Sequence, residues 1–139
     1  MNKNPDSFFD QALLKYKEGA SYEELLQDFL LIVESNPSHF AAWTCLSWLQ
    51  LLTNQNNKAL ISARNAVKLN NQDPQARINL SLALLATNSK GVRENVDFVR
   101  KCISMVPDIK SELIESLEDG LTRKPDWGEL SKIRSWLGV

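Results

Sequence analysis

Apolar side chains recur along most of the chain at the three- to four-residue spacing of amphipathic helices. Phe9, Leu13 and Tyr16 form one such stripe, and Leu25, Phe29 and the residues around them form the next. Strand-like alternation of Val, Ile and Thr is missing, and most prolines and glycines fall between the periodic segments. We therefore predict an all-α fold of about eight helices, starting near residues 5, 21, 38, 57, 74, 92, 108 and 125.

Several predicted helices carry terminal signals. Ser21 followed by Glu24 forms a capping box, and Asp73 before Pro74 is a typical helix start. Gly19 and Gly120 are expected to end the first and seventh helices, so that the seventh spans about 108–119. The turns between helices are short, which favours antiparallel neighbours and hence a chain of helical hairpins.

The segment 38–52 is the most apolar of the predicted helices. Because apolar residues nearly encircle it, we expect this helix to be buried on more than one side or to face a partner. Trp43 is expected in the core. For Trp48 two placements stay open, one in a binding groove and one against an adjacent hairpin.

The helix–turn–helix pattern occurs twice at a spacing of 34 residues, as the pairs Leu46-Ser47 and Leu80-Ser81 show. This period and architecture resemble the tetratricopeptide repeat (TPR) family over about residues 5–108, most strongly over 40–108. Asn95 departs from the pattern, because a small alanine is usual there. The resemblance is carried by Trp43, Leu46, Ser47, Ala59 and Ala66, by Leu80, Ser81, Cys102 and Pro107, and more loosely by Phe8, Ala12, Phe29 and Pro37.

The resemblance implies one domain over residues 1–139, an antiparallel helix-hairpin solenoid wound as a right-handed superhelix. A degenerate hairpin would span 5–37, two repeats 40–73 and 74–108, and a C-terminal capping hairpin 108–138. Trp127 and Trp136 are expected to cover the last apolar face of the solenoid. If exposed, they would instead mark a second interaction or dimer surface.

The resemblance further implies protein binding in a concave groove lined by the first helix of each hairpin. One subclass of the family grips a C-terminal carboxylate with Lys, Asn and Arg, and Asn79 alone does not reproduce that set. We therefore expect an apolar helix or an extended apolar segment as the ligand of an adaptor or assembly factor. The predicted groove residues are Thr44, Trp48, Leu52, Gln75, Ile78, Leu82 and Leu85.

Composition narrows the classes of partner. Of the residues, 43% are hydrophobic, and the net charge of −1 lacks the basic excess of a nucleic-acid binder. Residues 38–92 carry five basic and one acidic residue. That segment is the sole support for a weaker alternative, an RNA-binding helical repeat. A structural or self-associating subunit of a larger complex is the other alternative, suggested by the apolar segment 38–52 and the C-terminal tryptophans.

No sequence pattern in the chain indicates a catalytic or metal-binding site. His39, the single histidine, has no Cys or His at ligand spacing, so we expect no metal site and place it at the surface. Cys45 and Cys102 lie far apart and are best explained as reduced core residues. Glycine-rich phosphate loops and nucleophile elbows are also missing. We therefore expect no enzyme activity and no cofactor.

The apolar runs of the chain bear on where the protein resides. The longest, around residues 41–52, is too short to span a bilayer, and no basic start followed by an apolar run indicates a signal peptide. We expect a cytoplasmic protein without membrane insertion, which could reach a membrane through a partner.

Overall fold

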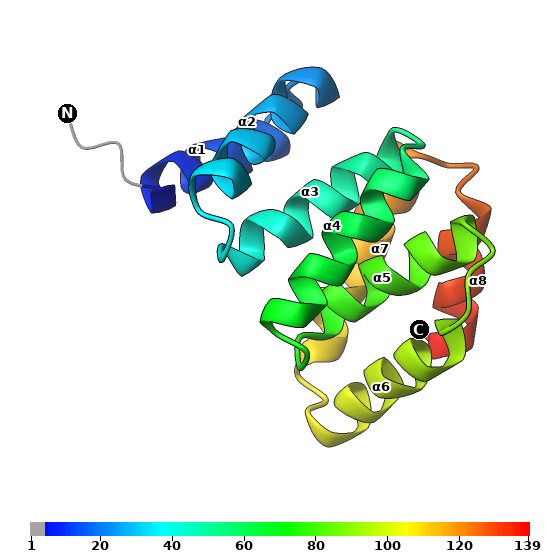
Figure 1. The fold of residues 1–139 in the computed structure, drawn as a ribbon. Helices are drawn as coiled ribbons and strands as arrows, with labels where there is room; N and C mark the ends of the chain where they lie inside the picture. Colours follow the sequence, from blue (N-terminus) through cyan, green and yellow to red (C-terminus); the bar gives the residue numbers. More distant parts are fainter. Residues whose placement is uncertain (1–4) are drawn as a thin grey trace.

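The computed structural model describes residues 5–139, which form eight helices and no strand (Figure 1). The prediction of an all-α fold is confirmed. The helices are α1 (Pro5–Lys17), α2 (Tyr22–Ser35), α3 (Phe40–Leu52), α4 (Asn56–Leu69), α5 (Pro74–Ala86), α6 (Val92–Met105), α7 (Ile109–Arg123) and α8 (Gly128–Leu137).

Consecutive helices pack as hairpins, α3 with α4 and α5 with α6, and α4 also packs against α5. Small side chains lie where α3 and α4 cross: Ser47, Ala59 and Ala66 are all fully buried. Without bulk at these points, two helix axes can approach closely. All three residues are among those that carry the family resemblance.

The 34-residue period extends to the backbone at the helix ends. Thr53 and Thr87, 34 residues apart, follow α3 and α5, and each hydroxyl donates a 2.8 Å hydrogen bond to the carbonyl four residues earlier. The next residues, Asn54 and Asn88, both have positive φ angles, of 60° and 53°. Asparagine tolerates this left-handed conformation better than most residues. The first two residues of the turn are therefore alike in the two repeats.

The helix starts combine predicted and unpredicted caps. Ser21 Oγ accepts a hydrogen bond from the Glu24 amide, and the Asp73 carboxylate accepts one from the Ala76 amide. His39 occupies the position equivalent to Asp73, and its Nδ1 accepts from the Ala42 amide at 3.1 Å. His39 is half-buried against Phe9, so its expected surface position is only partly right.

The turn after α5 spans residues 87–91 and is longer than the turn after α3, which spans 53–55, and Asn95 holds its far end. Its buried side chain donates to the Gly91 carbonyl at 2.7 Å and accepts from Arg77 Nη1 at 3.0 Å. Gly91 itself has a φ of 110°, which an L side chain rarely adopts. The residue that departs from the family pattern thus fixes the start of α6.

Helix α7 does not end at Gly120, and the prediction of a stop there was wrong. The helix continues to Arg123, and Gly120 lies inside it, facing the rings of Trp48 and Trp127. A Cβ at this position would lie 2.9 Å from two ring atoms of Trp48. The glycine is needed for a close approach between α7 and α3, not for a left-handed turn.

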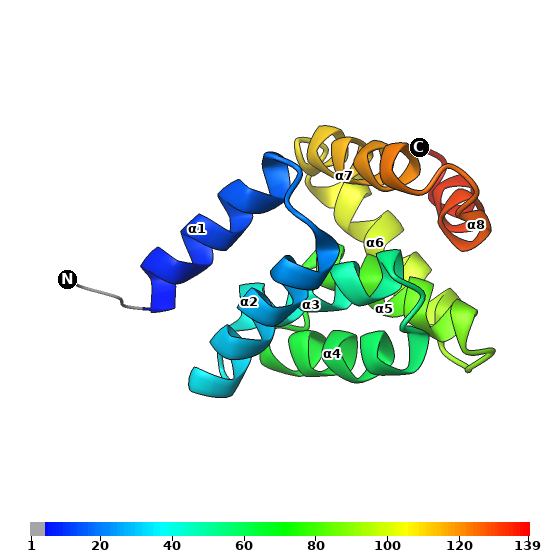
Figure 2. The ribbon, with the colours of Figure 1, turned by 90° about the horizontal axis from the view of Figure 1, so that it is seen from above.

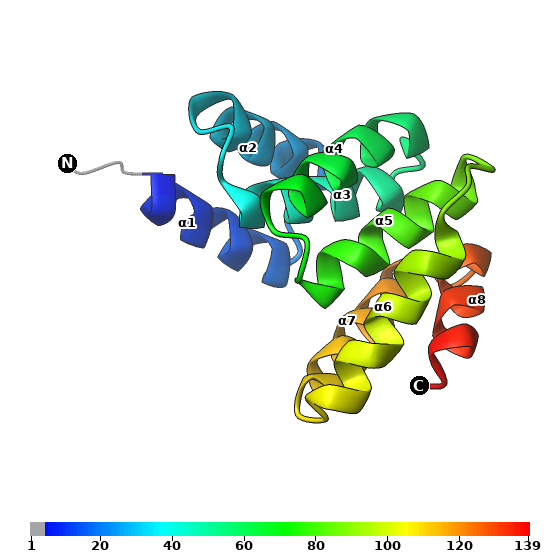
Figure 3. The ribbon, with the colours of Figure 1, turned by 60° about the horizontal axis from the view of Figure 1, so that its bottom comes forward.

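The last two helices fold back over the repeats. Seen from above, α7 and α8 lie on one side of α3 and α5, and α4 lies on the other (Figure 2). Helix α8 runs beside α6 and packs on both α5 and α6 (Figure 3). Large apolar residues of α7, of α8 and of its N-cap join the same core cluster as α3 and α5: Leu113, Leu117, Trp127, Leu130, Ile133 and Leu137.

This arrangement buries α3 on more than one side, as predicted. Trp43 is an exception, because it is half-buried and its indole nitrogen donates to the Pro37 carbonyl at 2.8 Å. Trp43 packs against the core cluster without being enclosed in it, so the expectation that it belongs to the core is only partly right. Within residues 5–139, no helix is both long and apolar enough to cross a bilayer.

Candidate functional site

A largely apolar cavity of about 180 Å³ opens on the inner face of α3. Its wall is built by five helices, with α1 and α2 on one side, α3 at the base and α5 and α7 on the other side. The lining residues are Leu13, Tyr16, Phe29, Thr44, Cys45, Trp48, Leu49, Gln75, Asn79, Ser116 and Asp119.

Three of the seven predicted groove residues, Thr44, Trp48 and Gln75, line this cavity. Leu52, Ile78 and Leu82 are buried in the core cluster to which α7 and α8 also contribute. Leu85 is half-buried and packs against this cluster. The sequence pattern did not reveal that α7 and α8 cover this part of the inner face. Contact with a partner stays a prediction for all seven, but only the first three stand at an opening.

Trp48 combines the two placements considered for it. It lies on the inner face of α3 and is only 8% exposed, because α7 and α8 cover it. Its ring lies 5.2 Å from the Trp127 ring, and its indole nitrogen donates to the Tyr16 hydroxyl at 2.9 Å. Trp48 is therefore mainly a core residue, with one edge on the cavity.

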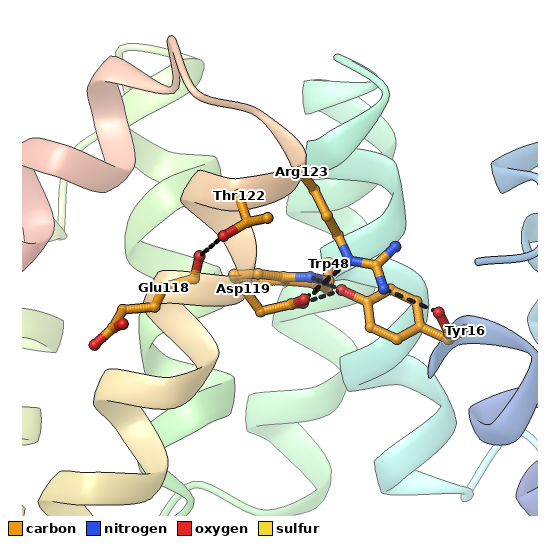
Figure 4. A network of polar contacts seen from close by, with 6 residues as sticks. All are labelled: Tyr16, Trp48, Glu118, Asp119, Thr122 and Arg123. Carbon is orange, nitrogen blue, oxygen red and sulfur yellow. Dashed lines mark hydrogen bonds and ion pairs between the residues drawn. The ribbon is translucent and has the colours of Figure 1, made fainter. Parts of the chain in front are cut away.

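A polar network, here called the Tyr16 clasp, joins α1, α3 and α7 beside the cavity (Figure 4). It consists of Tyr16, Trp48, Asp119 and Arg123. The Tyr16 hydroxyl donates to Asp119 at 2.5 Å, and Arg123 donates from Nη2 to the Tyr16 carbonyl at 2.9 Å. The guanidinium of Arg123 lies 3.7 Å from the centre of the Tyr16 ring and also pairs with Asp119 at 3.1 Å. The clasp fixes the distance between the two walls of the cavity.

Burial sets the protonation of two lining groups. Burial, reinforced by the hydrogen bond to Asp119, raises the pKa of Tyr16 well above its ordinary value, so the phenol stays a neutral donor. Burial also raises the pKa of the Cys45 thiol to about 12. Because the thiolate is the reactive form, Cys45 is a poor nucleophile at neutral pH.

Asn79 holds α5 against α3 under the cavity. Its Nδ2 donates to the Thr44 carbonyl at 3.0 Å and to Ser47 Oγ at 3.1 Å, and its Oδ1 accepts from Gln75 Nε2 at 2.9 Å. These bonds occupy the amide inside the fold. Asn79 is therefore a structural residue here and presents little to a ligand.

The lining groups are suited to holding an apolar group. Asp119 is engaged in the clasp, Cys45 is protonated, and the remaining polar atoms belong to neutral side chains. Across the described part of the chain, no cluster of three or more His, Cys, Asp or Glu residues could bind a metal ion. The site offers shape and apolar surface, with Thr44 and Gln75 as polar groups at its edge.

The fold is similar to that of several solved helical-repeat proteins. The type III secretion translocator chaperone SycD of Yersinia enterocolitica matches with a TM-score of 0.69 at 15% identity, over 88% of this chain and 92% of that one. A MamA RS-1 ArsTM double mutant matches with a TM-score of 0.63 at 17% identity, over 99% of this chain and 75% of that one. The first TPR of Spaghetti (RPAP3), bound to an HSP90 peptide, matches with a TM-score of 0.57 at 15% identity, over 100% of this chain and 97% of that one.

Comparison of the sequence with protein families and with curated proteins finds no relative. No protein-family model matches the sequence, and no curated protein matches it significantly. At identities of 15–17%, the structural likeness concerns the fold. The chain has the all-α, TPR-like helical-repeat fold that its 34-residue period indicated.

Proposed function

We propose that this protein is a non-catalytic binding module, an adaptor or assembly factor, that holds an apolar side chain of a partner protein in the cavity on α3. The cavity itself is the observation that carries the proposal. A cavity of about 150 Å³ lined by apolar side chains can take up benzene. The 180 Å³ available here is therefore enough for one phenylalanine or leucine side chain of a helix or extended segment.

The rest of the predicted groove is unsuited to an incoming helix. To open it, a partner would have to displace α7 and α8, which bury six large apolar side chains against α3, α5 and α6. At roughly 1.5–3 kcal/mol for each side chain, that would cost about 10 kcal/mol or more. Partner contact is therefore confined to the open end, where Thr44 and Gln75 can bond to a backbone.

Two of the similar structures support a binding role by analogy. One is a TPR bound to an HSP90 peptide, and another is named a translocator chaperone. The segment that enters the cavity on α3 is expected to differ from that peptide, whose sequence SRMEEVD is acidic and polar, because the cavity wall here is largely apolar. The proposed setting is the cytoplasm.

Filling the cavity tests the proposal. Ser116 lines the cavity from α7, so Ser116→Phe would occupy the space that a partner side chain needs. Ser111→Phe adds the same group at an exposed position of the same helix and is the matched control. Each variant and the wild type would be used for quantitative affinity purification from the native source, alongside thermal melts.

We expect Ser116→Phe to stay folded and to lose a protein that the wild type and Ser111→Phe both retain. If the folded Ser116→Phe variant keeps every partner of the wild type, the cavity is not the binding site. A structure of the variant would verify that the phenyl ring occupies the cavity.

Self-association is the second candidate function, and exposed apolar residues on the N-terminal hairpin favour it. Leu14 on α1 and Leu31 on α2 are both more than half exposed, and Leu30 is also exposed. Light scattering over a range of protein concentrations tests this candidate. A dimer that becomes monomeric in Leu31→Glu would support it, and a strictly monomeric wild type would exclude it.

A further inference from the structure

A second hollow, of about 430 Å³, lies between α6 and α8 and shares no lining residue with the cavity on α3. The residues that line it are Val92, Arg93, Val96, Asp97, Arg100 and Trp136. A neighbouring depression continues along α6 and is lined by Asp97, Arg100, Lys101 and Ser104. Together the two form one surface, here called the α6–α8 groove.

Trp136 is the apolar feature of this groove. It is 47% exposed, whereas Trp127, the other tryptophan of the C-terminal segment, is 2% exposed and packs on Trp48. The two tryptophans thus divide the roles considered from the sequence, one covering the core and one remaining accessible. Tryptophan and arginine are the residue types most enriched among binding hot spots, and here they line one hollow.

The arginines of the groove are available for a ligand. Neither Arg93 nor Arg100 forms an ion pair with another residue of 5–139, although Asp97 lies one turn from each. By contrast, Arg123 and Arg134 of the C-terminal segment pair with Asp119 and Glu118. With Lys101, the groove carries three cations against one anion.

The geometry sets the spacing of the charges. Arg93 and Arg100 are seven residues apart on α6, which at 1.5 Å per residue corresponds to about 10 Å along the helix axis. A segment in the polyproline II conformation makes one turn in three residues and rises about 9 Å over them, so side chains three positions apart share one face. Two carboxylates three positions apart in such a segment would therefore match the two guanidinium groups.

We propose that the α6–α8 groove docks an acidic segment of a partner protein, in which two carboxylates three positions apart flank an apolar side chain. The carboxylates pair with Arg93 and Arg100, and the apolar side chain covers Trp136. Charge complementarity supports an acidic occupant, and the planar guanidinium fork suits a carboxylate. A protein is favoured over RNA because the whole chain has a net charge of −1. This site is independent of the cavity on α3.

Peptide selection on the full-length chain tests the groove. A display library of random 12-residue peptides would be panned on the wild type and on Arg93→Glu/Arg100→Glu. Peptides enriched only on the wild type would be synthesised and their affinities measured by fluorescence anisotropy. The control is Arg64→Glu/Lys68→Glu, which makes the same change in net charge on exposed positions of α4.

We expect the enriched peptides to share two acidic residues three positions apart around an apolar one. Their affinity should fall about tenfold or more for Arg93→Glu/Arg100→Glu and for Trp136→Ala, and little for the α4 control. Ser116→Phe should leave it unchanged, so that failure of this site and failure of the cavity can be told apart.

Four results would overturn the proposal. The first is enrichment of peptides without the acidic pair, and the second is equal loss of affinity in the α4 control, which would indicate unspecific attraction. The third is tighter binding of a labelled oligouridylate than of the selected peptides at the same site, which would make the groove a nucleic-acid site. The fourth is concentration-dependent self-association that Arg93→Glu/Arg100→Glu abolishes, because the occupant would then be a second copy of the chain.

Discussion

Replacing Gly120 by alanine should destabilise this protein, although the same change in most helices stabilises. Alanine is better than glycine in a helix interior by about 1 kcal/mol. Here the added methyl group would lie 2.9 Å from Cζ2 and Cη2 of Trp48 and 3.2 Å from Cζ3 of Trp127. Both rings are buried, and the hydrogen bond to Tyr16 restrains the first. Overpacking of this kind costs about 1–3 kcal/mol.

The two effects leave a net loss of about 1 kcal/mol in the free energy of unfolding of Gly120→Ala. Gly128, in the first turn of α8, has no atom within 4 Å of an added Cβ, so Gly128→Ala should be neutral or stabilising. Urea unfolding followed by circular dichroism measures both variants. A gain in stability for Gly120→Ala equal to that of Gly128→Ala would refute the close approach of α7 to α3.

A double-mutant cycle isolates the cause. Phenylalanine at position 48 lacks the ring atoms that the new methyl group would meet. In a Trp48→Phe background, Gly120→Ala should therefore be neutral or stabilising, with a coupling energy of about 1–3 kcal/mol. Without such coupling, the cost of Gly120→Ala would have to lie elsewhere than in the Trp48 ring.

The remaining predictions concern the residues around the cavity. Tyr16→Phe removes a donor to Asp119 and the acceptor of the Trp48 indole, and should cost about 1–3 kcal/mol in urea unfolding. Because the pKa of Tyr16 is raised in the folded state, its contribution is complete below the ordinary value of 10.0 and declines above it. The stability difference between wild type and Tyr16→Phe should therefore shrink above pH 10, and a constant difference would contradict this origin. Asn79→Ala breaks the bonds to Thr44 and Ser47 and should cost about 2 kcal/mol or more, measured in the same way; a change below about 0.5 kcal/mol would show that these bonds do not hold α5 to α3. In a Cys102→Ser variant, iodoacetamide at pH 8 should alkylate Cys45 about a hundredfold or more slowly than in the urea-unfolded chain, because burial raises the pKa of the thiol to about 12; equal rates would mean that Cys45 is open to solvent.

Local sequence patterns were sufficient to predict that the chain forms eight helices and that two of its hairpins repeat. The helix starts at Ser21 and Asp73 depend on neighbours within a few residues, and the 34-residue period is visible in the sequence itself. His39 was not expected as a cap, because imidazole is not among the side chains that usually fill this role. The glycine at position 120 was misread because helix ends and close helix crossings both call for glycine.

The candidate site depended on contacts that leave no local trace. An amphipathic stripe on α7 or α8 shows that a face is buried, but not which surface buries it. Tyr16 and Asp119 are 103 residues apart, and nothing in the sequence around either residue indicates that it bonds to the other. Thr44, Trp48 and Gln75 were assigned to the inner face by the repeat pattern, whereas Leu13 and Ser116, on the opposite walls, could be found only from the fold.

The Tyr16 clasp also has a consequence for how the chain unfolds. In an open repeat array each unit touches only its neighbours, so the ends can unravel while the middle persists. Here hydrogen bonds join residues 103 and 107 positions apart, and α7 and α8 cover the repeats between them. Loss of the last helices would expose the inner face of α3, and loss of α1 would free Arg123. The two ends should therefore melt together in a single transition, and the high sequence separation of these contacts should slow folding relative to an open array of the same length.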